Sequence, residues 1–323
     1  MGDPLQDRRW LAAAARLAGR ARPLSRPNPG VGAILVRDGV VLSRGWTQVG
    51  GRPHAEAVAL EGVDAHGATL YVTLEPCAHK STRGPACADL VAASGVARVV
   101  IGCTDPDPRT AGAGIAKLEA AGIAVELVDC PASRASLAGY LMQRTKGRPH
   151  ITLKLALSLD GCLALANGES QWITGPEARA HTHVMRAQAD AILVGGGTLR
   201  ADHPKLDVRL AGLEHCSPSR WVLTRGAVPE GWNALPSPQA VHGMADVQYL
   251  FIEGGAQTAA AFLQADLVDR LLLYRAPILI GAGQGGVADL GLTHLADAHG
   301  RWRATDRRVL GKDVLDVYEA LQI

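Results

Sequence analysis

Apolar residues in the first half of the chain fall into short runs whose period alternates between that of a strand and that of a helix. The strand-like runs are expected at residues 31–39, 40–46, 68–76, 97–105 and 123–128, the first two as a hairpin. Helices are predicted at 54–62, 85–94, 113–122 and 131–147. The N-terminal stretch also has helical spacing, at Trp10, Leu11, Ala14, Leu17 and Ala18. This alternation is typical of an α/β unit with a mostly parallel sheet.

The second half repeats the alternation with different landmarks. In residues 151–161, leucines at 153, 155, 157 and 159 alternate with Lys154, Ala156, Ser158 and Asp160, so one face belongs to a core and the other meets something polar. Further strands are predicted at 189–196, 220–225, 248–255 and 269–281, with helices at 176–188 and 257–266. The basic turn TKGRPH marks a boundary near residue 147, which predicts two α/β domains, 1–147 and 148–323.

Composition narrows the classes of partner. The 323 residues are 47% hydrophobic, enough for two cores, while a formal charge of +2 and 4% aromatic residues do not suit a nucleic acid strand. A small molecule is therefore the expected partner. No run of eighteen apolar residues occurs and arginines interrupt the N-terminal helix, so we expect a cytoplasmic protein without a membrane partner. The sequence leaves the formation of a homo-oligomer open.

The stretch TLEPCAHKSTRGPACAD, residues 73–89, contains two cysteines separated by nine residues. Six irregularly spaced cysteines argue against a disulfide framework. With His54, which opens a predicted helix, Cys77 and Cys87 make the three-protein-ligand set of a catalytic zinc with a fourth position for water. The alternatives are unrelated buried thiols, or a closed structural zinc with His79 or Cys103 as fourth ligand.

Glu56 follows His54 in the segment PHAE. A hydroxide made from zinc-bound water still needs a group that takes one proton and delivers it to the leaving amine. Zinc deaminases of bases carry H-x-E followed by P-C, with the glutamate off the metal as general acid/base. This pattern makes Glu56 the candidate proton carrier, whereas a closed zinc site would leave it without a role.

Across its length the chain resembles the bifunctional pyrimidine deaminase/reductase family of riboflavin biosynthesis. The resemblance rests on PNPGVGAILV, PHAEAVAL, TLEPCAHK, TDPDP, LKLALSLDG, NGESQWITG, AILVGGGT, ADHPKLDVR and FIEGGAQTAAAFLQADLVD. It implies a cytidine-deaminase-like N-terminal domain and a dihydrofolate-reductase-like C-terminal domain. It also implies two reactions: zinc-dependent hydrolytic deamination of 2,5-diamino-6-(5-phosphoribosylamino)pyrimidin-4-one, then reduction of the ribosyl group to ribityl by NADPH.

The resemblance also assigns residues in the first domain. His54, Cys77 and Cys87 align with the zinc ligands of the family, and Glu56 with its proton carrier. Asn28 and His79 align with substrate contacts. Lys80 and Arg83 are candidates for the substrate phosphate, with solvated surface charges as the alternative.

In the second domain, Lys154 is implied as the catalytic residue that meets a sugar oxygen. The implied substrate residues are Ser170, Arg186, Leu206, Arg209 and Glu253. The segment FIEGG followed by AQTAAAF is a strand, a glycine turn and a helix start, which offers free amides to a pyrophosphate. The implied NADP contacts are Ala156, Trp172, Thr198, Asp202, Arg225, Gly255, Ala256, Gln257, Thr258, Ala259, Ala260 and Ala261. GAGQGG at 281–286 is interpreted as a loop, since no clear helix follows it.

Two features depart from the family pattern. The segment between Cys77 and Cys87 has one residue more than in most relatives, in KSTRG, and Arg225 stands where similar proteins often have serine. A loop absorbs one extra residue at low entropic cost, so we expect ligation to survive. The alternatives to a bifunctional enzyme are a deaminase with a decayed reductase domain and a non-catalytic, zinc-stabilised binding protein.

Overall fold

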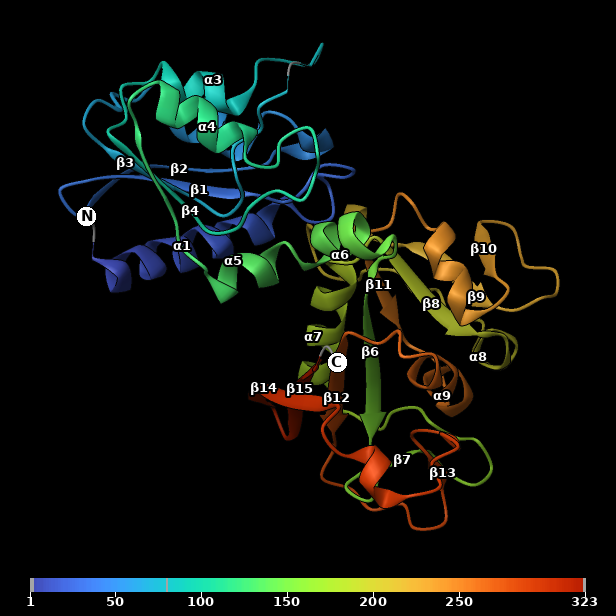
Figure 1. Ribbon diagram of the computed structural model, residues 1–323. Coiled ribbons are helices and arrows are strands. Elements are labelled where there is room, and N and C mark those ends of the chain that lie inside the picture. Colours follow the sequence, from blue (N-terminus) through green and yellow to red (C-terminus); the bar gives the residue numbers. More distant parts are fainter. Residues whose placement is uncertain (1–2, 80, 322–323) are drawn as a thin grey trace. The chain divides into compact units, whose positions relative to one another are not determined.

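The computed structural model describes residues 3–79 and 81–321. The chain divides into two compact units, Met1–Gly147 and Arg148–Ile323 (Figure 1). Both consist of a sheet with helices packed on it, so the predicted α/β class is confirmed. None of the helices in the described ranges has the length and apolar character that a membrane span requires.

The first unit is built on a five-stranded sheet in the order β2-β1-β3-β4-β5. The strands are β1 Gly32–Arg37, β2 Val40–Trp46, β3 Thr69–Val72, β4 Arg98–Ile101 and β5 Ala124–Leu127. β1 pairs antiparallel with β2, as the predicted hairpin requires, and with β3. β3, β4 and β5 are parallel.

The helices of this unit are α1 Pro4–Ala18, α2 Ala55–Leu60, α3 Cys87–Ala92, α4 Ala113–Ala120, α5 Pro131–Ser136 and α6 Ala138–Lys146, with 3-10 turns at Gly19–Ala21 and Val49–Gly51. The single helix predicted over 131–147 is wrong, because the chain breaks it at Leu137. That residue leaves helical geometry at φ −101° and ψ 3°, and its side chain is buried in the core.

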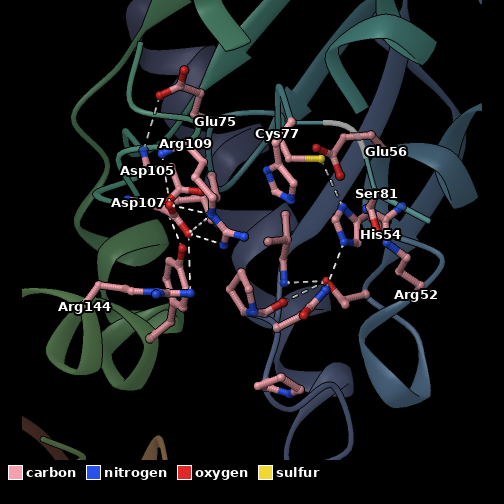
Figure 2. A pocket seen from close by; sticks show the side chains of 18 of the residues that line it. Arg52, His54, Glu56, Glu75, Cys77, Ser81, Asp105, Asp107, Arg109 and Arg144 are labelled. Atoms are coloured by element: carbon pink, nitrogen blue, oxygen red, sulfur yellow. Dashed lines mark hydrogen bonds and ion pairs between the residues drawn. The ribbon is translucent and has the colours of Figure 1, made fainter. Parts of the chain in front are cut away.

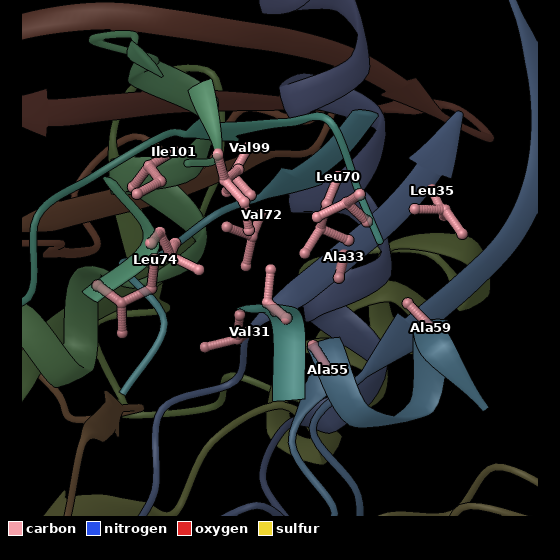
Figure 3. Close-up of a cluster of buried hydrophobic side chains, with 14 of the residues drawn as sticks. Val31, Ala33, Leu35, Ala55, Ala59, Leu70, Val72, Leu74, Val99 and Ile101 are labelled. Atoms are coloured by element: carbon pink, nitrogen blue, oxygen red, sulfur yellow. The ribbon is translucent and has the colours of Figure 1, made fainter. Parts of the chain in front are cut away.

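Strand alternation divides the apolar residues of this sheet between two faces. Ala33, Leu35, Leu70, Val72 and Val99 pack with residues of α2 to α4 on one face (Figure 3). The residues between them in the strands pack with Leu11 and Ala14 of α1 on the other: Ile34, Val36, Tyr71 and Val100. The predicted apolar stripe of the N-terminal helix is thus the cover of the second face.

The second unit has an eight-stranded sheet in the order β10-β9-β8-β11-β6-β12-β15-β14. Its strands are β6 His150–Leu157, β8 Ala191–Gly195, β9 Ser219–Leu223, β10 Trp232–Leu235, β11 Tyr249–Ile252, β12 Arg270–Arg275, β14 Trp302–Leu310 and β15 Asp313–Ala320. The first six strands in sheet order run parallel to one another. β15 pairs antiparallel with β12, and β14 pairs antiparallel with β15. β7 Cys162–Ala164 and β13 Gln284–Gly285 form a separate two-stranded pair. The segment GAGQGG, residues 281–286, is otherwise a loop, as predicted.

Among its described residues, the unit also contains the helices α7 Pro176–Ala187, α8 Gly196–Asp202 and α9 Ala256–Gln264, and 3-10 turns at Glu214–Cys216, Pro238–Gly243 and Leu295–Ala298. Leu153, Leu193, Leu250 and Ile252 pack with Phe262 of α9 on one face. Ile192, Phe251, Leu272 and Tyr274 pack with Ala178 of α7 on the other. Lys154 lies one residue from Leu153 on β6, so it points to the α7 face.

Several elements of this unit differ from the prediction. β6 ends at Leu157, so Leu159 is 55% exposed and does not continue the buried face. β12 ends at Arg275, short of the predicted residue 281. The strands β10, β14 and β15 and the helix α8 were not predicted. β14 is the edge strand and carries exposed residues on both sides, which removes the alternation that identifies a strand.

Candidate functional sites

Three potential metal ligands converge at one edge of the first sheet. His54 is the N-cap residue of α2, Cys77 follows the loop after β3, and Cys87 opens α3. Their ligand atoms all lie within 4.8 Å of one another. Nδ1 of His54 lies 3.2 Å from Sγ of Cys87 and 3.5 Å from Sγ of Cys77. Tetrahedral zinc with ordinary bond lengths separates such atoms by about 3.6 Å, so the cluster fits this metal.

The local electrostatics favour a thiolate in this cluster. Hydrogen bonds from the Cys87 thiol and from His54 outweigh burial and lower the pKa of the Cys77 thiol, helped by the backbone N–H of Cys87 at 3.3 Å. The hydrogen bond between the two thiols, together with burial, raises the pKa of Cys87. The cluster therefore favours the thiolate at Cys77, the form in which a cysteine binds a metal.

Glu56 lies in the first turn of α2, beside these ligands but not among them. Its side chain is 3% exposed, and burial raises the pKa of its carboxyl to about 7, against the charge of His54. Neither His79 nor Cys103 belongs to the ligand cluster found in the described chain. A set of three protein ligands leaves a fourth tetrahedral position for water, and the buried carboxyl of Glu56 lines the same cavity as His54 and Cys77.

The cluster lies at a cavity of about 330 Å³. The sequence-predicted residues that line it are Asn28, His54, Glu56, Cys77, His79 and Arg83. Cys87 is 1% exposed and does not line the cavity. Lys80, the other candidate for the phosphate, lies outside the described residues. The sequence therefore predicted most of the polar residues that line the cavity on the side of His54 and Cys77.

Asn28 connects the cavity wall to the imidazole of His54. Its Nδ2 lies 3.1 Å from Nε2 of His54 and donates to the carbonyl of Gly51 at 2.9 Å. Because Nδ1 faces the cysteines, Asn28 contacts the imidazole at its other nitrogen, and its side chain lines the same cavity.

The opposite wall was not predicted from the sequence. It is formed by Asp105, Asp107, Arg109, Tyr140 and Arg144, some of which Figure 2 shows facing the metal ligands across the cavity. Tyr140 donates to Asp105 at 2.7 Å, and Asp107 forms ion pairs with Arg109 at 2.5 Å and Arg144 at 3.4 Å. Arg109 lowers the pKa of Asp107, whereas burial raises that of Asp105. TDPDP offered a signal for the two acids, but no spacing connects them with Tyr140 or Arg144 on α6.

The second unit assembles a different polar cluster on the α7 face of its sheet. Glu253, directly after β11, accepts from Arg186 of α7 at 2.6 and 3.1 Å and lies 3.8 Å from Nζ of Lys154. Burial lowers the pKa of Lys154. Burial opposes ionisation of Glu253, but Lys154 and Arg186 together outweigh it and lower its pKa. Two cations around one carboxylate leave a positive excess, which suits an anionic ligand.

The other predicted substrate residues differ in how closely they approach this cluster. Leu206 is buried near Phe251 and Tyr274, and the adjacent Asp207 carbonyl accepts from Arg186 at 2.9 Å. The amide of Arg209 donates to His183 of α7 at 3.2 Å, while its guanidinium is exposed. Ser170 is half-buried on the loop before α7, and no hydrogen bond among the described residues connects it with Lys154. The structure thus brings Leu206 and Arg209 to the cluster but not Ser170.

The predicted cofactor segment forms the start of α9. Gly255 is the N-cap residue, and the amide of Ala259 is the first to donate within the helix, to the carbonyl of Gly255. The amides of Ala256, Gln257 and Thr258 are therefore directed out of the helix end. Ala259 and Ala260 are buried, so their side chains pack in the core. This arrangement fits a pyrophosphate and narrows the predicted contacts to the first residues of the segment.

The remaining predicted cofactor residues lie on separate elements of the second unit. Thr198 of α8 lies at the α9 start, since its Oγ1 is 3.8 Å from where a Cβ of Gly255 would stand. Asp202 ends α8, and Arg225 follows β9 with its side chain exposed. Trp172 is 65% exposed and stacks with the guanidinium of Arg179 at 4.9 Å. Ala156 shares a face of β6 with Lys154.

Fold and sites together define a zinc-type deaminase unit joined to a reductase unit. The models of two families match: residues 4–103 match the zinc-binding region of cytidine and deoxycytidylate deaminases, and residues 149–236 and 239–315 match the RibD C-terminal domain. The riboflavin biosynthesis protein RibD of Escherichia coli K12 is 38% identical, over 96% of this chain and 98% of its own length.

Solved structures agree over the whole chain. RibD of Acinetobacter baumannii superposes with a TM-score of 0.87 at 34% identity, covering 99% of this chain and 100% of its own. A diaminohydroxyphosphoribosylaminopyrimidine deaminase/5-amino-6-(5-phosphoribosylamino)uracil reductase of Thermotoga maritima gives 0.88 at 29% identity, covering 98% and 99%. The chain belongs to the RibD family of riboflavin biosynthesis proteins. The predicted fold pair, cytidine-deaminase-like and dihydrofolate-reductase-like, is thereby confirmed.

Proposed function

We propose that the chain catalyses two consecutive reactions of riboflavin biosynthesis on one phosphoribosylated pyrimidine. Residues 1–147 remove the 2-amino group of 2,5-diamino-6-(5-phosphoribosylamino)pyrimidin-4-one by hydrolysis, and residues 148–323 reduce the ribosyl group of the product to ribityl with NADPH. The observation that carries the proposal is the buried Glu56 beside three ligand atoms within 4.8 Å of one another, at a cavity that can hold a pyrimidine. The names and coverage of the relatives support it.

In the first reaction, a zinc ion held by His54, Cys77 and Cys87 supplies an activated water when bound. Glu56 accepts a proton from that water and delivers one to the departing amine, so that water adds and ammonia leaves. Its near-neutral pKa suits both transfers, because the carboxyl can hold and release the proton at one pH. Asn28 and His79 face the same cavity and bind the pyrimidine.

In the second reaction, NADPH supplies the hydride, and the amides at the α9 start hold its pyrophosphate. Lys154 hydrogen-bonds the sugar oxygen at which negative charge develops. Glu253 and Leu206 define the substrate side of this site, and Arg209 meets the phosphate. Arg186 already uses three donor groups, to Glu253 and Asp207, so its contribution is to position Glu253 and to add positive charge.

Ala156, Trp172, Thr198, Asp202 and Arg225 are the further cofactor contacts in this proposal, and Ser170 is a further substrate contact. All six cysteines are free. Free thiols fit the reducing conditions of the cytoplasm, so a cytoplasmic location is part of the proposal.

A coupled assay tests both reactions in one preparation. Zinc-loaded protein with the diamino substrate is expected to release ammonia, and NADPH is expected to be oxidised only after deamination. Failure of the deaminated compound to oxidise NADPH would reduce the proposal to a deaminase with an inactive second unit. Absence of ammonia release from zinc-loaded protein would favour the binding protein instead.

A further inference from the structure

The carboxylate of Glu75 lies two residues before the metal ligand Cys77, and the proton transfers of Glu56 do not involve it. Glu75 is 2% exposed. Four backbone amides donate to its two oxygens, those of Asp105, Gly112, Gly114 and Ile115, at 3.4, 3.1, 3.0 and 3.3 Å. Three of them belong to the N-cap residue and the first turn of α4, where amides lack a partner inside the helix. The carboxylate therefore joins the segment before Cys77 to the start of α4.

The start of α4 also touches the main chain next to Cys77. A Cβ at Gly114 would overlap with the carbonyl oxygen of Pro76 and would lie 3.1 Å from Oε1 of Glu75. Gly114 is buried, so a side chain has no room there. The glycine therefore lets the helix end pack directly against the peptide that leads into Cys77.

Lys117, further along α4, holds the chain on the other side of Cys77. Its Nζ donates to the carbonyl of Ala78 at 3.2 Å and to the carboxylate of Asp89 at 2.7 Å. Asp89 lies in the first turn of α3, the helix that Cys87 opens. α4 thus contacts the chain on both sides of one thiol and close in sequence to the other.

We refer to Glu75 and Lys117, with their contacts between α4 and the cysteine segments, as the α4 brace. The brace also reaches the facing wall of the cavity, through the amide of Asp105 that donates to Glu75 (Figure 2). Asp105 lines this wall with Asp107, whose amide donates to Oδ1 of Asp105 at 3.0 Å. One buried carboxylate therefore connects the Cys77 segment, α4 and the facing wall.

We propose that the α4 brace positions the thiols of Cys77 and Cys87 for the metal of the deaminase reaction. Glu75 acts through the main chain, because hydrogen bonds to an ionised carboxylate are stronger than those between neutral groups and restrain the residues next to Cys77. Glutamine at this position keeps a single acceptor oxygen and turns an NH₂ group toward amide donors. Two of the four amides then lose their acceptor, and the Cys77 segment is held less firmly.

The inference rests on the proposed function for its reaction, but metal binding tests it without substrate. Glu75→Gln is compared with Asp7→Asn, which removes a buried carboxylate that accepts from Arg98 and Tyr71 in the same unit, away from the cysteines. Zn²⁺ titrated into the metal-free full chain against a competing chelator is expected to bind Glu75→Gln about 10- to 100-fold more weakly than Asp7→Asn. Equal affinity of these two variants would overturn the proposal.

A second variant keeps the test decisive if Glu75→Gln does not fold. Lys117→Met keeps an apolar stem on α4 and removes the contacts to Ala78 and Asp89. Because this ion pair is partly exposed, Zn²⁺ binding is expected to weaken only about 2- to 5-fold relative to Lys146→Met, at an exposed position of α6. In that case, equal affinity of Lys117→Met and Lys146→Met overturns the proposal.

Two further readouts separate positioning from a general loss of stability. In Co²⁺-loaded protein, the thiolate-to-cobalt absorption band should shift or weaken in Glu75→Gln but not in Asp7→Asn. At saturating Zn²⁺, kcat for deamination should fall about 10- to 100-fold in Glu75→Gln relative to Asp7→Asn, because small displacements of a reacting centre are costly. An unchanged cobalt spectrum together with an unchanged kcat contradicts positioning by the brace. If the wild type releases no ammonia, the proposed function fails, while the metal affinities still decide on the brace.

Discussion

The site in the first unit draws its ligands from neighbouring segments, whereas the site in the second unit draws its charges from distant ones. His54 and Cys87 are 33 positions apart, and each lies at the start of a helix. Arg186 and Glu253 are 67 positions apart and come from a helix and a strand end. The first site gathers thiols and an imidazole, which attract a cation. The second gathers two cations around one acid, which leaves room for an anion.

Because different interactions hold the two sites, the two units should respond to different perturbations. The first site gains its charge balance from a metal, so its integrity depends on that metal. The second site is held by ion pairs among its own side chains, those of Glu253 with Lys154 and Arg186. Perturbations that act on only one unit therefore test whether the two sites are independent.

Removal of the metal is expected to have the largest effect. A chelator should abolish ammonia release, because His54, Cys77 and Cys87 would then hold no activated water. NADPH oxidation by the deaminated compound should continue at its original rate. The measurement is ammonia release and NADPH absorbance on one sample before and after chelation, with added Zn²⁺ as the control. Ammonia release that persists in metal-free protein would contradict this prediction.

Glu56→Gln is expected to lower kcat for deamination about 10²- to 10⁴-fold, because the amide cannot carry the proton. Zinc content should not change, since Glu56 is outside the ligand cluster. Glu61→Gln, at the exposed end of the same helix, is the matched control. Deamination by the Glu56 variant at the rate of that control would exclude the proton-carrier role. The reductase rate should be the same in both variants.

Lys154→Ala is expected to lower kcat for reduction about 10²- to 10³-fold, because it removes the cation that stabilises charge on the sugar oxygen. Deamination should remain within a factor of about two, as expected for independent sites. Lys312→Ala, at an exposed turn of the same unit, controls for the loss of a lysine. A parallel loss of both activities would show that the two sites are coupled. The two rates are measured separately, each with its own substrate.

The smallest expected effect concerns stability in acid. Asp7 of α1 pairs with Arg98 of β4 at 2.7 Å, and this hydrogen-bonded pairing lowers the pKa of Asp7 despite its burial. Because the pKa is lower in the folded state, the contribution to stability is complete above the unfolded value of about 3.9 and is lost as pH falls through the folded value. Urea unfolding of wild type and Asp7→Asn should therefore differ by a constant amount at neutral pH and converge below about pH 4. A difference that grows on acidification would contradict the assignment.

The sequence predicted the site of the first unit better than that of the second, for a physical reason. His54, Glu56 and Cys77 lie at helix starts or just after a strand, where local pattern places a side chain at the sheet edge. The facing wall of Asp105, Asp107 and Arg144 depends on where α6 packs, which no local pattern specifies. For the second unit, alternation placed Lys154 on a polar face, but its ion pair with Glu253 requires the pairing of β6 with β11.

The missed strands have a similar cause. β14 is an exposed edge strand with arginines and threonine on both sides, so its pairing with β15 is its main distinguishing feature. The break between α5 and α6 falls at Leu137, whose backbone leaves helical geometry although the spacing of apolar residues continues through it. Local patterns identify elements that have one buried face, and they fail where an element is exposed on both sides or bends to fill a core.

Residue type and short spacing were enough to predict the α/β class, the division into two units and the cluster of His54, Cys77 and Cys87 with Glu56 beside it. Only the tertiary structure decided which charges are neutralised. It paired Arg109 and Arg144 with Asp107 and Arg186 with Glu253. Electrostatic balance depends on distances of a few ångströms between segments far apart in the chain, and such distances exist only in the folded protein.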